Sequence, residues 1–173
     1  MERAINLDDP IYEHADLLAA TGLKSPTAQM WLMKGAIAPS VPNPGPGQPR
    51  RWNARDIAGV AATHALVQCQ VPISHATRIV LRLRSTPEWG AILDQFAAGK
   101  NPSVYVLATF TSGMIRSAHV SSDREGVGKF LMGSSASVWR EAPEGEESWS
   151  HSAVYGIGRD IFRAMRFMKA AQP

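Results

Sequence analysis

The 173-residue chain contains one cysteine, Cys69. A single cysteine cannot form an internal disulfide, and it fits a reducing compartment. The sequence also has no apolar run near the roughly 20 residues that a membrane-spanning helix needs. Its first residues lack the apolar stretch of a secretory signal. We therefore expect a cytoplasmic protein that does not associate with membranes.

Sequence motifs for metals, phosphates and cofactors are missing as well. The five histidines are scattered without a His-x₃-His pair. The glycines of residues 126–129 lack the spacing of a phosphate-binding loop, and those of residues 156–158 lack the third glycine of a dinucleotide fingerprint. Serine, histidine and aspartate are common enough to leave a catalytic triad open, but no pattern indicates one. We expect a protein that is not an enzyme, with no catalytic residue, no metal and no cofactor.

Charge is distributed unevenly along the chain. The composition, with 45% hydrophobic and 19% charged residues, is that of an ordinary globular protein with a core. Residues 1–85 contain nine Lys or Arg and six Asp or Glu, whereas residues 86–173 contain nine of each. The whole net charge of +3 thus belongs to the first half. A basic balance permits a polyanionic partner without establishing one.

The first half is organised around a short helix bracketed by glycines. Periodicity predicts helices over about residues 13–21 and 26–34. Gly22 can adopt the positive φ that ends the first helix, Ser25 is the expected N-cap of the second, and Gly35 ends it. Two helices joined by a glycine-containing turn are the outline of a helix-turn-helix. The alternative to a DNA-binding helix-turn-helix is an ordinary helical hairpin that only packs within the core.

A loop rich in proline and glycine follows the second helix. Residues 38–49 contain five prolines and two glycines, which exclude a helix or a central strand. We expect a loop, or wing, between short extended pieces. Asn53 then caps a helix over about residues 54–67, and another helix opens at Ser74 and runs to about residue 84.

Together these segments resemble the DNA-binding domain of MerR-type winged-helix regulators over about residues 9–84. The resemblance rests on two spaced signatures in the right order: Gly22, Thr27, Trp31, Gly35, Ile37 and Pro39, then Arg50, Trp52, Asn53, Asp56 and Ile57. Gln29 and Met30 stand where the family usually has an arginine and an aromatic residue. The family's long dimerising helix and metal-sensing cysteines are absent.

The resemblance implies that the second helix enters the major groove and that Trp31 lies in the core. Gln29 suits adenine, and methionine or threonine suits the thymine methyl group. Basic side chains beside the flexible loop suit phosphates. The predicted DNA-binding residues are Lys24, Ser25, Thr27, Gln29, Met30, Lys34, Arg50 and Arg51.

No family is recognised in the second half. Its patterns predict a helix, a hairpin, two further strands, an exposed acidic loop and a terminal helix. The helix lies at about residues 88–98, and the hairpin is formed by residues 103–110 and 114–120. The two further strands lie at about residues 129–138 and 152–158, with the acidic loop at residues 141–150 between them. The terminal helix covers about residues 160–170. The predicted fold class is α+β, with a mostly α winged helix-turn-helix followed by a small α+β domain with an antiparallel sheet. We divide the chain into a DNA-binding domain, residues 1–85, and a dimerisation or effector domain, residues 86–173.

The function that these patterns favour is sequence-specific binding of double-stranded DNA in transcriptional regulation. One such helix reads few base pairs, so we expect a homodimer on a two-fold site, joined through residues 86–173. A small-molecule or protein effector remains open. Two alternatives also remain: an excisionase-like architectural protein that bends DNA, and a protein-interaction or antitoxin-like module.

Overall fold

The structure is a computed structural model that describes residues 5–41, 45, 49–111, 114–137 and 150–171. Helices precede a small three-stranded antiparallel sheet, and one more helix closes the chain, which confirms the α+β class. The elements are α1 (His14–Thr21), α2 (Ser25–Met33), α3 (Ala54–Gln68), α4 (Ile73–Arg84), α5 (Pro87–Ala97), β1 (Tyr105–Thr111), β2 (Met114–Ser121), α6 (Arg124–Ser137), β3 (Ser150–Gly156) and α7 (Gly158–Ala170).

Helices α1 and α2 are joined by the predicted glycine turn. Gly22 has φ 72° and Gly35 has φ 65°, the left-handed conformation that glycine adopts without steric cost. The prediction that Ser25 caps α2 is wrong by one residue. The Lys24 carbonyl accepts the first helical hydrogen bond, from the Ala28 N–H at 3.0 Å, so Lys24 occupies the cap position and Ser25 is already helical.

The expected extended pieces flank the proline-rich loop. Val41 and Arg51 form an antiparallel bridge at the base of the loop. A second bridge joins Tyr12 to Trp52, with N–H to carbonyl distances of 3.1 and 2.9 Å. These bridges fasten the loop to the start of α1. The loop's remaining residues, 42–44 and 46–48, lie outside the described part of the chain.

The sheet order is β2-β1-β3, with both pairings antiparallel. The predicted hairpin is confirmed, and the strand predicted near residues 152–158 is β3. The strand predicted at residues 129–138 is wrong, because residues 129–137 belong to α6, while residue 138 lies outside the described part of the chain. An ion pair between Lys129 and Glu125 (2.7 Å, i,i+4) supports that helix, and the Asp123 side chain accepts a hydrogen bond from the Gly126 N–H at its start. The loop predicted at residues 141–150 lies outside the described residues, except that Ser150 begins β3.

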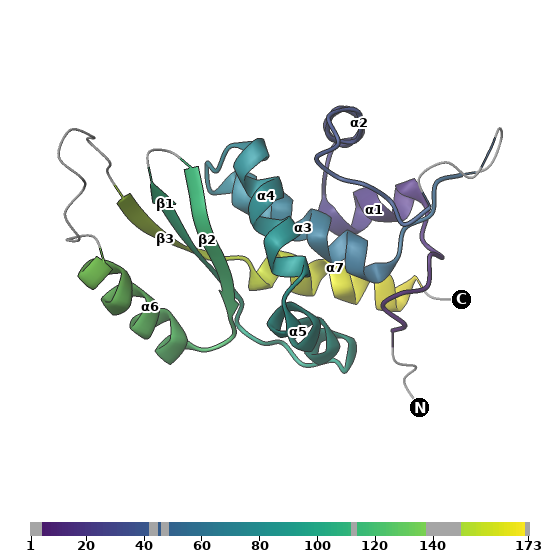
Figure 1. The fold of residues 1–173 in the computed structure, drawn as a ribbon. Coiled ribbons are helices and arrows are strands. Elements are labelled where there is room, and N and C mark those ends of the chain that lie inside the picture. The colour runs from purple at the N-terminus through teal and green to yellow at the C-terminus, as the bar shows by residue number, and fades with distance from the viewer. Residues whose placement is uncertain (1–4, 42–44, 46–48, 112–113, 138–149, 172–173) are drawn as a thin grey trace.

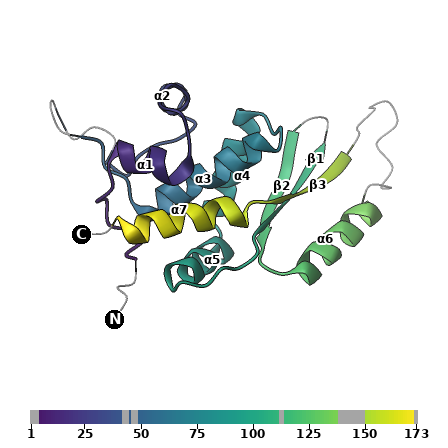
Figure 2. The ribbon, with the colours of Figure 1, turned by 180° about the vertical axis from the view of Figure 1, so that it is seen from behind.

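Helix α7 connects the two halves of the chain. Its buried face is the predicted one, including Ile161, Met165 and Met168, and it packs against α1 and α3 (Figures 1 and 2). The Tyr12 hydroxyl donates to the Met168 carbonyl at 3.3 Å. The hydrophobic core is therefore continuous across the proposed boundary at residue 85. The sheet lies at one end of the molecule, with α4 on one face and α6 on the other.

Candidate nucleic-acid interface

Helix α2 presents most of the predicted DNA-binding side chains on one outward surface. Both views of the fold show α2 at the margin of the helical part, on the side away from α5 (Figures 1 and 2). The predicted residues that are exposed there are Lys24, Ser25, Gln29, Met30 and Lys34, whereas Thr27 is half-buried. Met33, which the sequence reading did not include, is 89% exposed. It lies four residues after Gln29, on the same helical face, and this spacing was the available signal.

The opposite face of α2 anchors the helix to the core. Ala28 and Trp31 are buried, as predicted for Trp31. The Trp31 ring meets the His64 ring of α3 edge-on, with centroids 6.1 Å apart. His64 in turn lies 3.2 Å through its Nδ1 from the Thr21 carbonyl at the end of α1. These contacts fix α2 to the two helices that flank it while leaving its outer face uncovered.

Three predicted cations have no ion-pair partner within the described residues: Lys24, Lys34 and Arg50. All three are exposed, and the two lysines flank α2. By contrast, Arg51, Arg55 and Arg84 of the first half each form an ion pair. Arg55 lies 3.0 Å from Asp8, and the hydrogen bond with Arg55 lowers the pKa of the Asp8 carboxyl. The unpaired cations are thus available to an anionic partner.

Arg50 and Arg51 differ although they are adjacent in sequence. The Arg51 guanidinium lies 3.1 Å from a Glu13 carboxylate oxygen and donates to the Ile11 carbonyl at 3.1 Å. It therefore ties the base of the loop to the start of α1. Arg50 is exposed. The pKa of the His14 imidazole is lowered mainly by the burial of His14 itself and, second, by the positive charge of Arg50. Arg50 is thus the freer of the two side chains.

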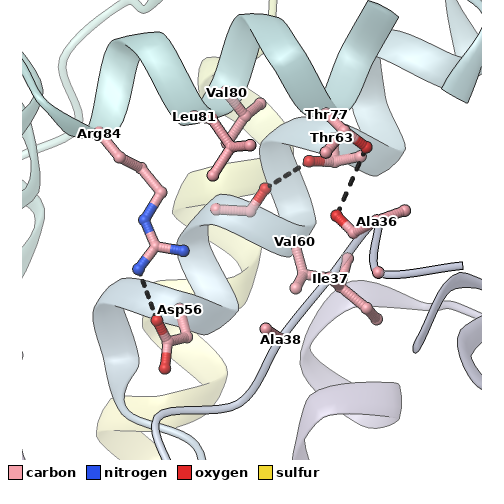
Figure 3. A pocket seen from close by; sticks show the side chains of 12 residues that line it. Ala36, Ile37, Ala38, Asp56, Val60, Thr63, Thr77, Val80, Leu81 and Arg84 are labelled. Carbon is pink, nitrogen blue, oxygen red and sulfur yellow. Dashed lines mark hydrogen bonds and ion pairs between the residues drawn. The ribbon is translucent and has the colours of Figure 1, made fainter. Parts of the chain in front are cut away.

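A buried ionic contact holds the segment between α2 and the loop. Asp56 is 4% exposed and accepts hydrogen bonds from Arg84 Nη2 of α4 at 2.6 Å and from the Ser40 hydroxyl at the base of the loop. Beside it lies a pocket of about 80 Å³ between α3, α4 and residues 35–38 (Figure 3). On the other side of the pocket, Thr77 donates to the Ala36 carbonyl at 3.4 Å. The path from α2 into the loop is therefore fixed to α3 and α4.

Sequence reasoning missed this contact, although Asp56 was part of the recognised signature. Its partners Ser40 and Arg84 are 16 and 28 residues away, so no local pattern could pair them. Among the predicted DNA-binding residues, the structure brings six together along α2 and its flanks, whereas Arg50 and Arg51 lie at the end of the proline-rich loop, where Arg51 is bridged to Val41.

No protein-family model matches this chain, and no curated protein matches it. Within the described residues, no group of three or more His, Cys, Asp or Glu side chains is placed to hold a metal ion. None of the helices in this part of the chain has the length and apolar character that crossing a membrane would require.

Proposed function

We propose that this protein is a transcriptional regulator that binds specific sequences of double-stranded DNA, acting in the cytoplasm as a homodimer on a two-fold site. The observation that carries the proposal is the surface of α2, which is anchored by Trp31 and keeps its polar and methionine side chains free. The surrounding sequence supports an anionic partner, because no acidic residue occurs between Asp16 and Asp56. The resemblance to MerR-type winged helices supports the same proposal.

Phosphate contacts would set the position of the protein on the duplex. Lys24, Lys34 and Arg50 supply free positive charge. The start of α2 adds unpaired backbone N–H groups, because Lys24 makes no side-chain cap and this end of the helix is exposed. Arg51 contributes by holding the loop, since its guanidinium already contacts Glu13 and Ile11. These contacts give affinity that falls with salt and carry no sequence information.

Base contacts would come from the outer face of α2. An α-helix with its side chains is about 10–12 Å in diameter, which fits a major groove about 12 Å wide, so the nine-residue α2 can lie in the groove. Gln29 can pair with an adenine edge through two hydrogen bonds, and Met30 and Met33 can contact thymine methyl groups. One bidentate pair contributes about 1–3 kcal/mol of discrimination. Ser25 and Thr27 stand on the flanks of the same surface.

The test begins with selection of bound sequences from a random double-stranded library, followed by fluorescence anisotropy over a salt series. We expect an enriched sequence and an affinity that falls steeply with salt. Gln29→Ala should weaken binding to the selected site by about 5- to 150-fold and leave random DNA unaffected, because it removes base discrimination of about 1–3 kcal/mol. Arg50→Ala should weaken both and reduce the salt slope by about 1.

Arg159→Ala is the matched control, since Arg159 is exposed at the start of α7 and outside the proposed surface. Equal losses for Gln29→Ala on selected and random DNA would refute the role of α2 in sequence reading. Absence of binding at low salt would favour the protein-interaction alternative. Strong bending of a bound fragment with little sequence preference would favour the architectural one.

A further inference from the structure

Strand β3 has a free edge in the described part of the molecule. Because β1 lies between β2 and β3, each outer strand pairs on one side only. The Ile157 N–H bonds to the Val104 carbonyl at 2.9 Å, which makes these two residues a hydrogen-bonded pair. Such pairs alternate along an antiparallel ladder, so Tyr155 and Ala153 also bond to β1. The backbone groups of the residues between them, Ser152, Val154 and Gly156, point away from β1.

The other edge of the sheet, β2, carries features that oppose strand pairing. Its register shifts by one residue beside Thr109 and Phe110, which leaves Arg116 as the extra residue of a bulge. The Arg116 carbonyl accepts a hydrogen bond from Arg82 Nη1 of α4 at 2.8 Å. Arg116 and His119 are exposed on this strand. A bulge, a covered carbonyl and charge are the devices by which proteins prevent edge-to-edge association.

None of these devices occurs on β3 among the residues whose side chains are described. Residues 152–156 are Ser, Ala, Val, Tyr and Gly, without charge or proline. The strand pairs with β1 over seven consecutive residues with no register shift. The uncharged stretch 152–156, on a strand without a register shift, is a template for another strand. The contrast between the two edges shows which of them is suited to an interface.

We propose that β3 pairs with β3 of a second copy of this chain, antiparallel and in register, to form a continuous six-stranded sheet. Ala153 then lies opposite Ala153 of the partner subunit at the two-fold axis, and Ser152 lies opposite the partner subunit's Val154. This register matches the geometry, because Ser152 and Val154 are both residues whose backbone groups point outward. It is also the register that pairs all seven residues of the strand.

The occupant is a second copy rather than an unrelated peptide because the edge is self-complementary. Residues 152–156 offer no charge that would select a charged segment, and the outward backbone groups of Ser152 and Val154 complement those of Val154 and Ser152 in a second copy. The side chains of Ala153 and Tyr155 lie on the face of the sheet toward the α3–α4 turn, where Tyr155 lines a cavity with Cys69 and His75. This dimer rests on the proposed function, since it supplies the two-fold symmetry that a two-fold DNA site requires.

The test is a cysteine cross-link without DNA. In a Cys69→Ser background, which removes the chain's one natural cysteine, Ala153→Cys places two thiols at the axis. Residues opposite each other in a non-hydrogen-bonded pair have Cα atoms about 4.5 Å apart, within the range of a disulfide. We expect a covalent dimer on mild oxidation, seen on a non-reducing gel and by light scattering. His119→Cys on the exposed β2 edge is the matched control and should remain monomeric on the gel.

A second pair of variants tests the backbone hydrogen bonds. Ser152→Pro removes an N–H that points to the partner but none that bonds to β1, whereas Ser152→Ala keeps it. Ser152→Pro should weaken dimerisation by about tenfold or more, through the two bonds lost by symmetry, with an unchanged circular dichroism spectrum. Ser152→Ala should dimerise as the parent does. The cross-link decides the matter if Ser152→Pro does not fold.

The inference is overturned if the parent is monomeric at high micromolar concentration, or if His119→Cys cross-links as readily as Ala153→Cys. Cross-linking at Ser152→Cys in preference to Ala153→Cys would overturn the register. The outcome is independent of DNA binding. A β3-linked dimer without DNA affinity would refute DNA binding and leave the dimer intact. A monomer that binds a specific DNA sequence would refute the dimer, and the homodimer of the proposed function with it, but not sequence-specific DNA binding.

Discussion

Helices α2 and α7 both contain methionines but use them in opposite ways. Met165 and Met168 of α7 are 2% and 0% exposed, whereas Met30 and Met33 of α2 are 44% and 89% exposed. In α7 the methionines continue a stripe with Ile161 and Ala164 that packs on α1 and α3. In α2 the buried anchors are Ala28 and Trp31, with the partly buried Leu32 packed beside them, whereas Met33 is almost fully exposed. The comparison separates apolar residues that hold the fold from apolar residues that are free to bind a partner.

The largest expected effect comes from the same substitution in the two helices. Met165→Ala should lower the free energy of unfolding by about 2–5 kcal/mol, because it leaves a cavity in the core. Met33→Ala should change it by less than about 0.5 kcal/mol, as expected for an exposed site. Urea unfolding followed by circular dichroism measures both. For DNA affinity we expect the reverse order. Met33→Ala should weaken binding to the selected DNA sequence more than Met165→Ala does, when both variants are assayed without urea and well below their unfolding temperatures.

A comparable cost for the two substitutions would show that Met33 also helps to anchor α2 to the core, in addition to Ala28 and Trp31. An unchanged DNA affinity for Met33→Ala would remove this residue from the proposed surface. Either result would mean that α7 and α2 do not differ in the proposed way, with methionines that stabilise the fold in α7 and methionines that bind DNA in α2.

An intermediate effect is expected at the contact that links α2 to the core. Arg84→Met removes one hydrogen-bond donor and the ion-pair partner of the buried Asp56 carboxylate, leaving the bond from the Ser40 hydroxyl, and should cost about 1–3 kcal/mol of unfolding free energy. Arg78→Met, on the exposed side of the same helix, is the control and should cost less than about 0.5 kcal/mol.

Since Ser40 lies at the base of the loop, Arg84→Met should also weaken binding to the selected DNA. Normal DNA affinity together with reduced stability would mean that the contact supports the fold without positioning α2. Hydrogen exchange of residues 35–41, measured in both variants, reports directly on that segment.

The smallest effect is expected from His14. Burial, and then the charge of Arg50, lower the pKa of this imidazole below its ordinary value of 6.5. As the pH falls through 6.5, the unfolded chain binds a proton before the folded protein does, so folding stability should fall with it. His14→Gln should flatten this part of the curve. Thermal unfolding between pH 7.5 and pH 5.5 gives the comparison, and identical slopes for the two proteins would contradict it.

Arg50→Gln sharpens the same measurement. Removing the positive charge beside His14 should raise the pKa of the imidazole toward its ordinary value and so reduce the pH dependence of stability. A slope unchanged from the parent would mean that burial alone lowers the pKa. Arg50, which we propose for phosphate contact, would then have no electrostatic effect on His14 of α1.

The local signals in the sequence predicted most helices correctly because they act within a few residues. Asn53 caps α3 by accepting from the Asp56 N–H at 2.7 Å, and Gly22 takes the left-handed conformation that ends α1. The failure at α6 has a tertiary cause. Its segment has glycines at residues 126 and 128 and only a weak apolar pattern. Val127 and Phe130 become half-buried because α6 packs on the sheet. Such packing overrides local propensity.

The candidate surface was predictable in part for the same reason. Helical spacing places Gln29 and Met33 on one face, and Trp31 on the other, whatever the rest of the chain does. Whether a basic residue is free or paired depends on distant groups. Arg51 is held by Glu13 and Ile11, 38 and 40 residues away, while its neighbour Arg50 is exposed.

The sequence by itself determined the α+β class, the turn at Gly22, the Asn53 cap of α3 and the hairpin, because these depend on backbone sterics and nearby hydrogen bonds. Only the tertiary structure decided that α7 returns to pack on α1 and α3, that Asp56 meets Arg84 and Ser40, and that β3 rather than β2 has the unprotected edge. These features join residues far apart in the chain, and burial and charge pairing between such residues arise only once the core has formed.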